Sequence, residues 1–536
     1  MSFNIIDEEV FPVVYTDGTK ANLGLKAIVS NLEKIAKIAG KNPMQELLVV
    51  RFLIAILYRS ERGPISKKDW IDLWANGFSV QKAQDYLEQH RSKFDLFDPV
   101  TPFYQILDAQ YEQAKTNPSN LAFIIDMQKV DHPASGPKFL YSNATEKGLA
   151  NIHPADAVLH LLELQNYSVA SKRSVLQGDP RRKKRGYAQQ GWLGNFSALM
   201  ILGTNLQETL LLNMPPYEFM ELKWETDLPL WEREAQTVAP EGVSGPLDES
   251  RVPTGPCDLY TSQSSRVTLH GDRNGVTNAV VGIGDRFFKY DRHKYEPMAS
   301  WVFAKREKDP PAYTPAKVNE GIAWRGMESL LARESKKDRI LAKNLDFYKT
   351  VKRLTRDKLG SFVNISVVTV HYGSQDAIIT DSSIDRLSLP QEAFDQDNFM
   401  VLDAIIASAK LAKEAASAVQ GFQVDILVSE GKERNPKKGV KPYALARHQS
   451  DAFLAEAEEA FHEWIEDLSS QNLLLKITNW KDLLSKKAYS FVNEITDNAS
   501  PNAIRGTEEE VKSVKKPINI FIAHRNFAKK LSTILK

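Results

Sequence analysis

The chain has few of the features that would place it outside the ordinary soluble proteins. One cysteine, Cys257, stands among 536 residues, so neither an internal disulfide nor a cysteine-rich zinc site can form. The longest apolar run, Leu47–Leu57, contains Arg51 and falls short of the about 20 residues that a membrane span needs. The acidic N-terminus is unlike a signal peptide. These absences favour a soluble cytoplasmic protein with no membrane partner.

An excess of charge of one sign is also lacking. Lys and Arg number 69 and Asp and Glu 68, which gives a net charge of +1. This excludes a histone-like basic protein, so any nucleic-acid site has to come from local clustering of charge. Hydrophobic residues make up 42% of the chain, which excludes wholesale disorder, and its length fits about two to four domains.

Sequence signatures of enzymes are absent as well. The chain has no GxxxxGK[ST], no GxGxxG after a strand, no HExxH and no GxSxG. The histidines are scattered, and the set His270, Cys257 and Asp272 matches no known metal-ligand spacing. We therefore predict no cofactor, no metal and no catalytic residue. A nuclease would need clustered acidic or histidine ligands, so the sequence favours a binding protein over an enzyme.

Residues 1–389 are predicted to form a large α+β domain. The β-branched run 363–372, followed by Gly373, is the clearest strand, and short β-like runs within 266–303 predict a small antiparallel sheet. The segment 94–105 is rich in proline and aromatic residues and predicts an ordered loop anchored by its rings. Apolar residues at helical spacing predict helices over 25–38, 44–59, 69–89, 156–167 and 205–213.

Residues 390–536 are predicted to form a C-terminal four-helix bundle. Phe453, Ala457, Phe461 and Trp464 share one face of a helix, and glutamates lie beside and opposite them. Short connections containing Gly, Pro and Asn separate four such segments. The predicted helices are 397–419, 444–470, 476–497 and 503–534.

The strongest local charge cluster lies between residues 172 and 185, where seven basic residues and Asp179 give a net charge of +6. Nearby glycines allow close approach of the backbone to a ligand, and Tyr187 and Trp192 add rings. Phosphate binding by such a cluster releases counterions. The alternative is a solvated loop. The cluster contains Arg181, Arg182, Lys183, Lys184 and Arg185.

A second basic segment, 432–441, connects the first two predicted bundle helices. Its candidate phosphate ligands are Lys437 and Lys438. Most runs of this kind are solvated loops, and that alternative stays open here.

Ordered motifs between residues 10 and 270 resemble one family. They are FPVVYTDG with LGLKAIVSNL, FDLFDPVTPFYQ, HPADAVLHLLELQNY, GTNLQETLLLN, DLPLWER and GPCDLYTSQSSRV. The chain is similar to the CasA family, the large subunits of the type I-E CRISPR surveillance complex Cascade. The resemblance implies a non-catalytic subunit that reads the protospacer-adjacent motif in duplex DNA and starts strand separation for R-loop formation. It also implies retention of the displaced strand and recruitment of the Cas helicase-nuclease.

The partners implied are crRNA, other Cascade subunits, double-stranded target DNA and its displaced strand, and the helicase-nuclease. A purely structural scaffold of a ribonucleoprotein is the alternative function. In that case the DNA-contact residues would be dispensable for DNA binding.

The resemblance also assigns residues. Family members insert a glutamine wedge after a strand, in an Asn-Gln-Ala sequence. Gln375 matches the wedge and Ser374 takes the place of the asparagine. Asp376 departs from the family, because a carboxylate is repelled by DNA unless it turns away or accepts a hydrogen bond from cytosine. The alternative for Gln375 is an ordinary turn residue.

The family's glycine loop falls in the basic cluster, with Gly186 as its key glycine. Lys184, Arg185 and Tyr187 replace neighbouring glycines, which favours entry of arginine side chains into a narrow minor groove. Candidates for a lysine finger are Lys289 and Arg286. A docking loop for the crRNA 5′ handle and the adjacent subunit is implied, with core packing of its rings as the alternative. Its candidate contacts are Phe139, Tyr141 and Asn143.

Overall fold

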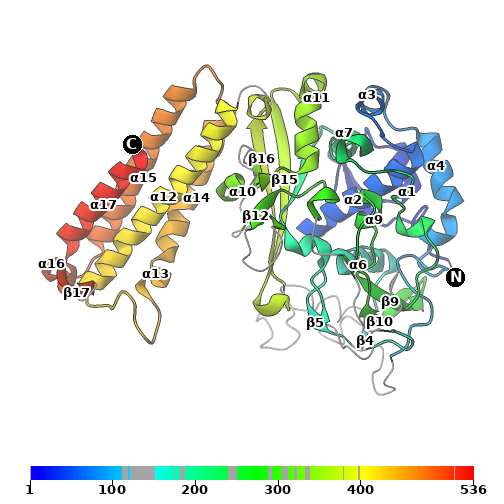
Figure 1. The fold of residues 1–536 in the computed structure, drawn as a ribbon, viewed down its shortest axis with the longest axis horizontal. Coiled ribbons are helices and arrows are strands. Elements are labelled where there is room, and N and C mark those ends of the chain that lie inside the picture. The colour runs from blue at the N-terminus through cyan, green and yellow to red at the C-terminus, as the bar shows by residue number, and fades with distance from the viewer. Residues whose placement is uncertain are drawn as a thin grey trace. The chain divides into compact units, whose positions relative to one another are not determined.

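The computed structural model has an α+β part and a helical part (Figure 1), which confirms the predicted fold class. The chain divides into two compact units, Met1–Leu387 and Ser388–Lys536. The residues that the structure describes are 2–111, 119–120, 151–173, 175–180, 187–239, 250–287, 292–304, 312–318, 323–331, 339–377, 379–395, 399–511 and 514–536.

A long buried helix forms the centre of the first unit. Helix α2 (Pro43–Glu61) is apolar on nearly all sides, as expected of a helix that other elements surround. Asn42 caps its start by accepting hydrogen bonds from two backbone amides. Elements that pack on α2 include α4 (Val80–Gln89), α6 (Pro154–Tyr167), α7 (Leu206–Leu212) and α9 (Pro256–Tyr260). The helices predicted over 44–59, 156–167 and 205–213 are therefore confirmed.

Two predicted helices of this unit are wrong in part. Helix α1 (Leu25–Ser30) ends at Ser30 instead of residue 38, because β3 (Ile35–Ile38) gains its hydrogen bonds by pairing with β1 (Phe11–Tyr15). Ile35 and Ile38 are both buried in this strand although residues three apart point to its opposite faces. The predicted helix 69–89 is broken at Gly77, whose φ of 76° lies in the left-handed region. The helices on either side are α3 (Lys67–Asn76) and α4.

The hairpin that carries the predicted wedge, Gln375, belongs to a sheet with the order β16-β15-β7. Strand β15 (Phe362–Tyr372) confirms the predicted strand and pairs antiparallel with β7 (Ala198–Leu202). Strand β16 (Ile379–Pro390) forms the other edge. Helix α11 (Lys343–Leu359) precedes β15. The antiparallel pair β9 (Ser265–Asp272) and β10 (Gly275–Ile283) confirms the second predicted sheet.

The segment 94–105 has irregular backbone after Phe94, as predicted. The rings of Phe94, Phe103 and Tyr104 contact the ring of Phe52 on α2. The other elements of the first unit are β2 (Lys20–Leu23), α1 (Leu25–Ser30), η1 (Arg91–Phe94), β4 (Ser119–Asn120), β5 (Ser171–Lys172), β6 (Tyr187–Ala188), η2 (Trp192–Asn195), α8 (Tyr217–Met220), η3 (Leu230–Glu232), β8 (Ser250–Arg251), β11 (Arg286–Phe287), η4 (Arg292–Lys294), β12 (Trp301–Ala304), β13 (Ala312–Pro315), η5 (Trp324–Gly326), α10 (Met327–Leu331), β14 (Arg339–Ile340) and η6 (Ser374–Asp376).

The second unit is a bundle of four long helices. Helix α12 contacts the other three, and the predicted core face of Phe453, Ala457, Phe461 and Trp464 is buried. The long helices are α12 (Met400–Ser429), α14 (Arg447–Glu466), α15 (Leu473–Asp497) and α17 (Ile520–Leu535). Short helical segments are η7 (Gln391–Phe394), α13 (Pro442–Leu445) and α16 (Pro501–Arg505).

The predicted fourth bundle helix, 503–534, is wrong in its first half. Helix α16 ends before Gly506, whose φ of 72° stops it, and a β-hairpin follows. In this hairpin β17 (Thr507–Val511) pairs antiparallel with β18 (Val514–Ile518), so a glutamate-rich strand faces a lysine-rich one. Asn519 then caps α17. None of the described helices is long and apolar enough to cross a membrane.

Candidate nucleic-acid interface

The tip of the β15–β16 hairpin presents Gln375 on a strained turn. Gln375 has φ 58° and ψ 23°, Asp376 has φ 55°, and the amide of Ala377 donates to the carbonyl of Ser374 at 3.3 Å. Positive φ at both central residues is typical of a tight hairpin turn, but a left-handed residue other than glycine costs about 1–2 kcal/mol. Ser374, Gln375 and Asp376 are all exposed. The turn therefore holds a strained, exposed glutamine at the end of a rigid strand pair.

Neighbouring elements fix the base of this hairpin. The backbone amide of Ala170 donates to the carbonyl of Asp376 at 2.8 Å. The hydroxyl of Tyr372 donates to the carbonyl of Tyr167, at the end of α6, at 3.0 Å. The ring of Tyr372 lies against Gly194 so closely that a Cβ on Gly194 would come within 2.4 Å of the hydroxyl oxygen. Glycine is therefore required at position 194, and the hairpin is held by a backbone hydrogen bond at its tip and by the Tyr372 side chain at its base.

The hydrogen bond from Ala170 to Asp376 also joins the hairpin to the predicted basic loop. Strand β5 begins directly after Ala170 and pairs with β6, with Lys172 opposite Tyr187. This short ladder is the stem from which the basic loop extends. The structure thus brings Tyr187 and the wedge candidate into one region of the first unit. Six predicted residues lie outside the described part of the chain, namely Arg181, Arg182, Lys183, Lys184, Arg185 and Gly186.

One basic residue of the cluster has a structural role. Arg173 donates from Nη1 to Ser265 Oγ at 2.7 Å and to the carbonyl of Gly282 at 3.0 Å. Burial lowers the pKa of its guanidinium to about 10. Arg173 therefore ties the start of the basic loop to β9 and β10.

Lys317 lies beside the hairpin base and was missed in the sequence. It follows β13, donates from Nζ to the carbonyl of Gly194 at 2.8 Å, and lies 5.4 Å from the centre of the Tyr372 ring. Burial lowers the pKa of Lys317 to about 8, although the charge of Asp376 acts in the opposite direction. The positive charge of Lys317 offsets the negative charge of Asp376, so the tip is less negative than its sequence implies. An isolated lysine in PAKV carries no signal of this role.

Arg286 lies near the segment that supports the hairpin. It lines a small cavity together with Gln190, Trp192 and Arg292. The indole of Trp192 donates to Glu296 at 2.6 Å, and the guanidinium of Arg292 lies 4.9 Å from its ring centre. The other candidate, Lys289, lies outside the described residues, as do Phe139, Tyr141 and Asn143.

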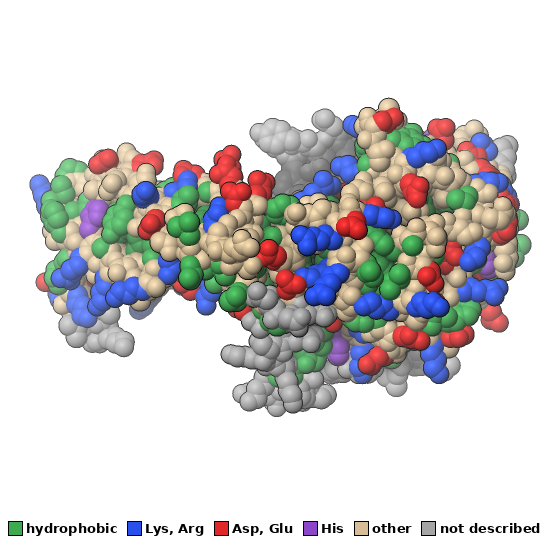
Figure 2. Space-filling model, turned by 90° about the horizontal axis from the view of Figure 1, so that it is seen from above, with side chains coloured by type: hydrophobic (Ala, Val, Ile, Leu, Met, Phe, Trp, Pro, Cys, Tyr) green, Lys and Arg blue, Asp and Glu red, His purple; other side chains and the backbone are tan. Residues whose placement is uncertain are grey.

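Lys437 and Lys438 belong to the second unit, in the connection between α12 and α13. Both are exposed. A neighbour in the same segment, Arg434, is bound by Asp425 and Glu509. Over the face seen in Figure 2, basic and acidic side chains alternate, in keeping with the net charge of +1.

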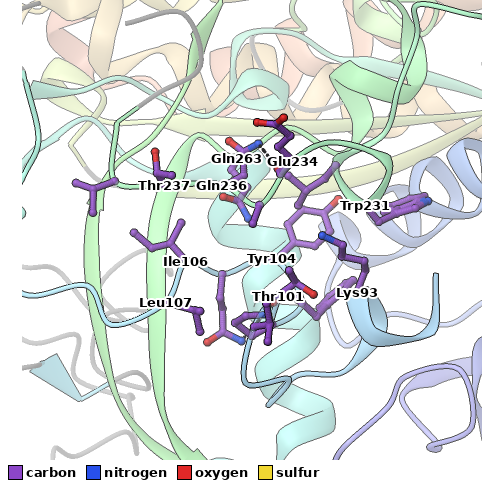
Figure 3. A pocket seen from close by; sticks show the side chains of 17 residues that line it. Lys93, Thr101, Tyr104, Ile106, Leu107, Trp231, Glu234, Gln236, Thr237 and Gln263 are labelled. Carbon is purple, nitrogen blue, oxygen red and sulfur yellow. Dashed lines mark hydrogen bonds between the residues drawn. The ribbon is translucent and has the colours of Figure 1, made fainter. Parts of the chain in front are cut away.

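A cavity of about 360 Å³ lies apart from these residues (Figure 3). Tyr104, Ile106 and Trp231 line it, so the motifs around 94–105 and 227–233 meet there. Val100 and Leu107 at its wall are 65% and 45% exposed. None of the predicted site residues lines this cavity.

Structures of the same two-part fold are known. A Cse1 from Thermobifida fusca has a TM-score of 0.84 and 25% identity, over 100% of this chain and 98% of that one. A chain of a CRISPR RNA-guided surveillance complex has a TM-score of 0.73 and 17% identity, over 100% of both chains, which shows the shared fold alone.

Sequence comparison then gives the family. The CasA/Cse1 protein of Thermus thermophilus is 28% identical over 340 residues, which span 62% of this chain and 61% of that protein. The profile of the CRISPR-associated protein Cse1 family matches residues 4–490. The chain belongs to this family, and the resemblance found in the sequence is confirmed.

Proposed function

We propose that the chain is the non-catalytic DNA-recognition subunit of a type I-E CRISPR RNA-guided surveillance complex, Cascade. In this role it assembles with crRNA and the other subunits, reads the protospacer-adjacent motif in duplex DNA and starts strand separation. It also holds the displaced strand and recruits the Cas helicase-nuclease. Membership of the Cse1 family supports the complex, and the geometry of the hairpin supports the recognition step.

The observation that carries the recognition step is the hydrogen bond from Ala170 to Asp376. It joins the strained tip bearing Gln375 to the stem of a loop whose cluster has a net charge of +6. A side chain that wedges between base pairs has to offset an unstacking cost of a few kcal/mol, and phosphate contacts nearby supply binding energy at the same place. A tip that is already held in place also loses less conformational freedom on binding.

In the proposed mechanism the basic loop approaches the duplex next to the motif. Gln375 then enters the base stack at the first pair to be opened. The amide of glutamine can both donate hydrogen bonds to the unpaired base edges and accept them. An ionised carboxylate only accepts, and an aliphatic side chain does neither. Guide pairing reads the rest of the sequence.

The scaffold alternative predicts that these residues have no effect on DNA. A gel-shift comparison separates the two functions. The crRNA-containing complex is assembled with and without this chain and offered a duplex with either a correct or a scrambled adjacent motif. We expect binding that depends on the motif only when the chain is present. Equal binding with and without the chain would leave it as a scaffold or a recruitment platform.

A further inference from the structure

The connection 431–441, which contains the basic segment 432–441, is held to the bundle by Arg434. Arg434 donates from Nε to Glu509 Oε1 at 2.6 Å, and from Nη2 to Glu509 Oε2 at 3.0 Å and to Asp425 Oδ1 at 2.7 Å. The side chains of Glu509 and Asp425 are 15% and 14% exposed, and that of Arg434 is 34% exposed. The forked contact with Glu509 fixes the plane of the guanidinium as well as its position.

Hydrogen bonds to backbone carbonyls hold the chain at the start of the segment and just beyond its end. The amide of Lys432 donates to the carbonyl of Leu427 at 3.1 Å, at the end of α12. At the other end Gln420 Nε2 donates to the carbonyl of Tyr443 at 2.9 Å. The exposed Lys437 and Lys438 lie between these ties, next to Gly439, whose φ is 96°. Arg434 thus fixes the middle of the segment through its bonds to Glu509 and Asp425.

Glu509 reaches Arg434 only because β17 is a strand. Successive side chains of a strand point to opposite faces, so Glu509 and Glu508 differ in direction. Glu508 pairs at 3.4 Å with Lys515 at the surface, and these side chains are 64% and 75% exposed. The hairpin also contacts α12, which carries Asp425. The sequence predicted a helix over these residues, in which Glu508 and Glu509 would not point to opposite faces as they do in β17.

We propose that the β17–β18 hairpin is a positioning element, which holds the segment 431–441 through Glu509 and Arg434 so that Lys437 and Lys438 are placed for the phosphates of a single strand. The inference rests on the proposed function, because it takes the segment to contact the displaced strand. Glu509 and Arg434 are positioning residues and need not touch the nucleic acid. Two lysines on a segment fixed in advance lose less freedom on binding than lysines on a loose one.

The test measures the affinity of the full chain for a labelled oligothymidylate by fluorescence anisotropy. Glu509→Gln removes a negative charge near the segment, which by itself would strengthen the binding of a polyanion. The proposal predicts the opposite sign, a weakening of about three-fold to ten-fold. Glu508→Gln makes the same change of charge on the opposite face of the strand and should leave the affinity equal or slightly stronger.

Arg434→Lys provides a variant without any change of charge. Lysine cannot make the forked contact with Glu509, so the proposal predicts weaker binding, whereas a purely electrostatic role predicts no change. Equal thermal unfolding midpoints in these variants would show that the bundle stays folded. Unchanged or tighter binding by both Glu509→Gln and Arg434→Lys would overturn the positioning role.

The proposed function of the segment has its own control. If the double variant Lys437→Gln with Lys438→Gln binds as tightly as the wild type, the segment does not contact the strand, and that part of the proposed function fails. If the lysine variant weakens binding while Glu509→Gln behaves like Glu508→Gln, contact stands and the positioning role is wrong.

Discussion

The hairpin tip 373–377 and the segment 431–441 are both exposed and both candidate DNA contacts, but they are held in different ways. The tip is fixed by uncharged hydrogen bonds, namely the backbone bond from Ala170 to Asp376 and the bond from the Tyr372 hydroxyl to Tyr167. The segment is fixed in its middle by charged side chains, through Arg434 and Glu509. An uncharged hydrogen bond does not depend on a neighbouring charge, whereas an ion pair is lost when either partner is neutralised. Substitutions at the tip should therefore act on the opening of the duplex, and substitutions in the segment on retention of the displaced strand.

The largest effect is expected from Gln375→Gly. Glycine adopts positive φ freely, so the relief of about 1–2 kcal/mol of strain, less the entropic cost of glycine of about 0.5–1 kcal/mol, should leave stability equal or slightly higher. Loss of the wedge should nevertheless slow target opening on the order of 100-fold, because unstacking has to be offset by a few kcal/mol. Opening is measured by the fluorescence of a base analogue next to the motif.

Asp376→Gly is the matched control for this prediction. It relieves strain at the adjacent position of the same turn and keeps Gln375. We expect opening at least as fast as in the wild type, because Gln375 is kept and a carboxylate that DNA repels is removed. Equal rates for Gln375→Gly and the wild type would refute the wedge assignment, and Gln375→Ala should then also open targets normally with assembly intact.

The second effect concerns the basic loop that extends from the β5–β6 stem. Replacing Arg181, Arg182, Lys183, Lys184 and Arg185 with glutamine should weaken duplex binding and flatten the dependence of log K on log salt, by up to about four units of slope. Affinity is measured by titration at several salt concentrations. Arginine in place of Lys183 and Lys184 keeps the charge and should change little. An unchanged slope in the neutralised variant would mean that the loop makes no phosphate contacts.

The sequence predicts the backbone-held region better than the region held by side chains. Strand β15 can be predicted because its β-branched run is followed by Gly373. Gln375, two residues after this glycine, is then expected in the turn. The long bundle helices can be predicted because each has a continuous apolar face, such as that of Phe453 and Phe461 in α14. Local patterns of this kind suffice where one element decides the outcome.

The parts that the sequence did not predict depend on contacts between distant segments. Lys317 lies at the hairpin base because of Gly194, 123 positions away in sequence. Arg434 is bound by Glu509, 75 positions away, on a strand that was predicted as a helix. Glutamates and lysines form helices readily, so periodicity alone did not show that residues 507–518 pair as a hairpin.

The third effect concerns the displaced strand. Replacing Lys437, Lys438 and Lys441 with glutamine should weaken retention of that strand by about ten-fold at low salt and by less at high salt, because exposed charges are screened. Footprinting of the displaced strand in the assembled complex is the measurement. Duplex binding through the motif should stay unchanged, which separates the segment from the tip. Full protection of the strand in this variant would mean that the bundle segment makes no contact with it.

The smallest effect comes from the half-buried cation at the hairpin base. Burial lowers the pKa of Lys317 to about 8 from its ordinary 10.5, so the folded state penalises the charged form. Between pH about 8 and about 10.5 the unfolded chain binds more protons at this lysine than the folded chain does, and stability should therefore rise with pH in this window. We expect a contribution of about 1 kcal/mol to the free energy of unfolding after allowance for solvent screening.

Urea unfolding of the wild type and of Lys317→Met across this window measures this contribution as a difference in the slope of the free energy of unfolding against pH. Lys437→Met, at an exposed position, is the control and should follow the wild type. If the two variants have the same slope, burial at the hairpin base does not penalise the charge, and the contrast between a buried and an exposed cation fails at this residue.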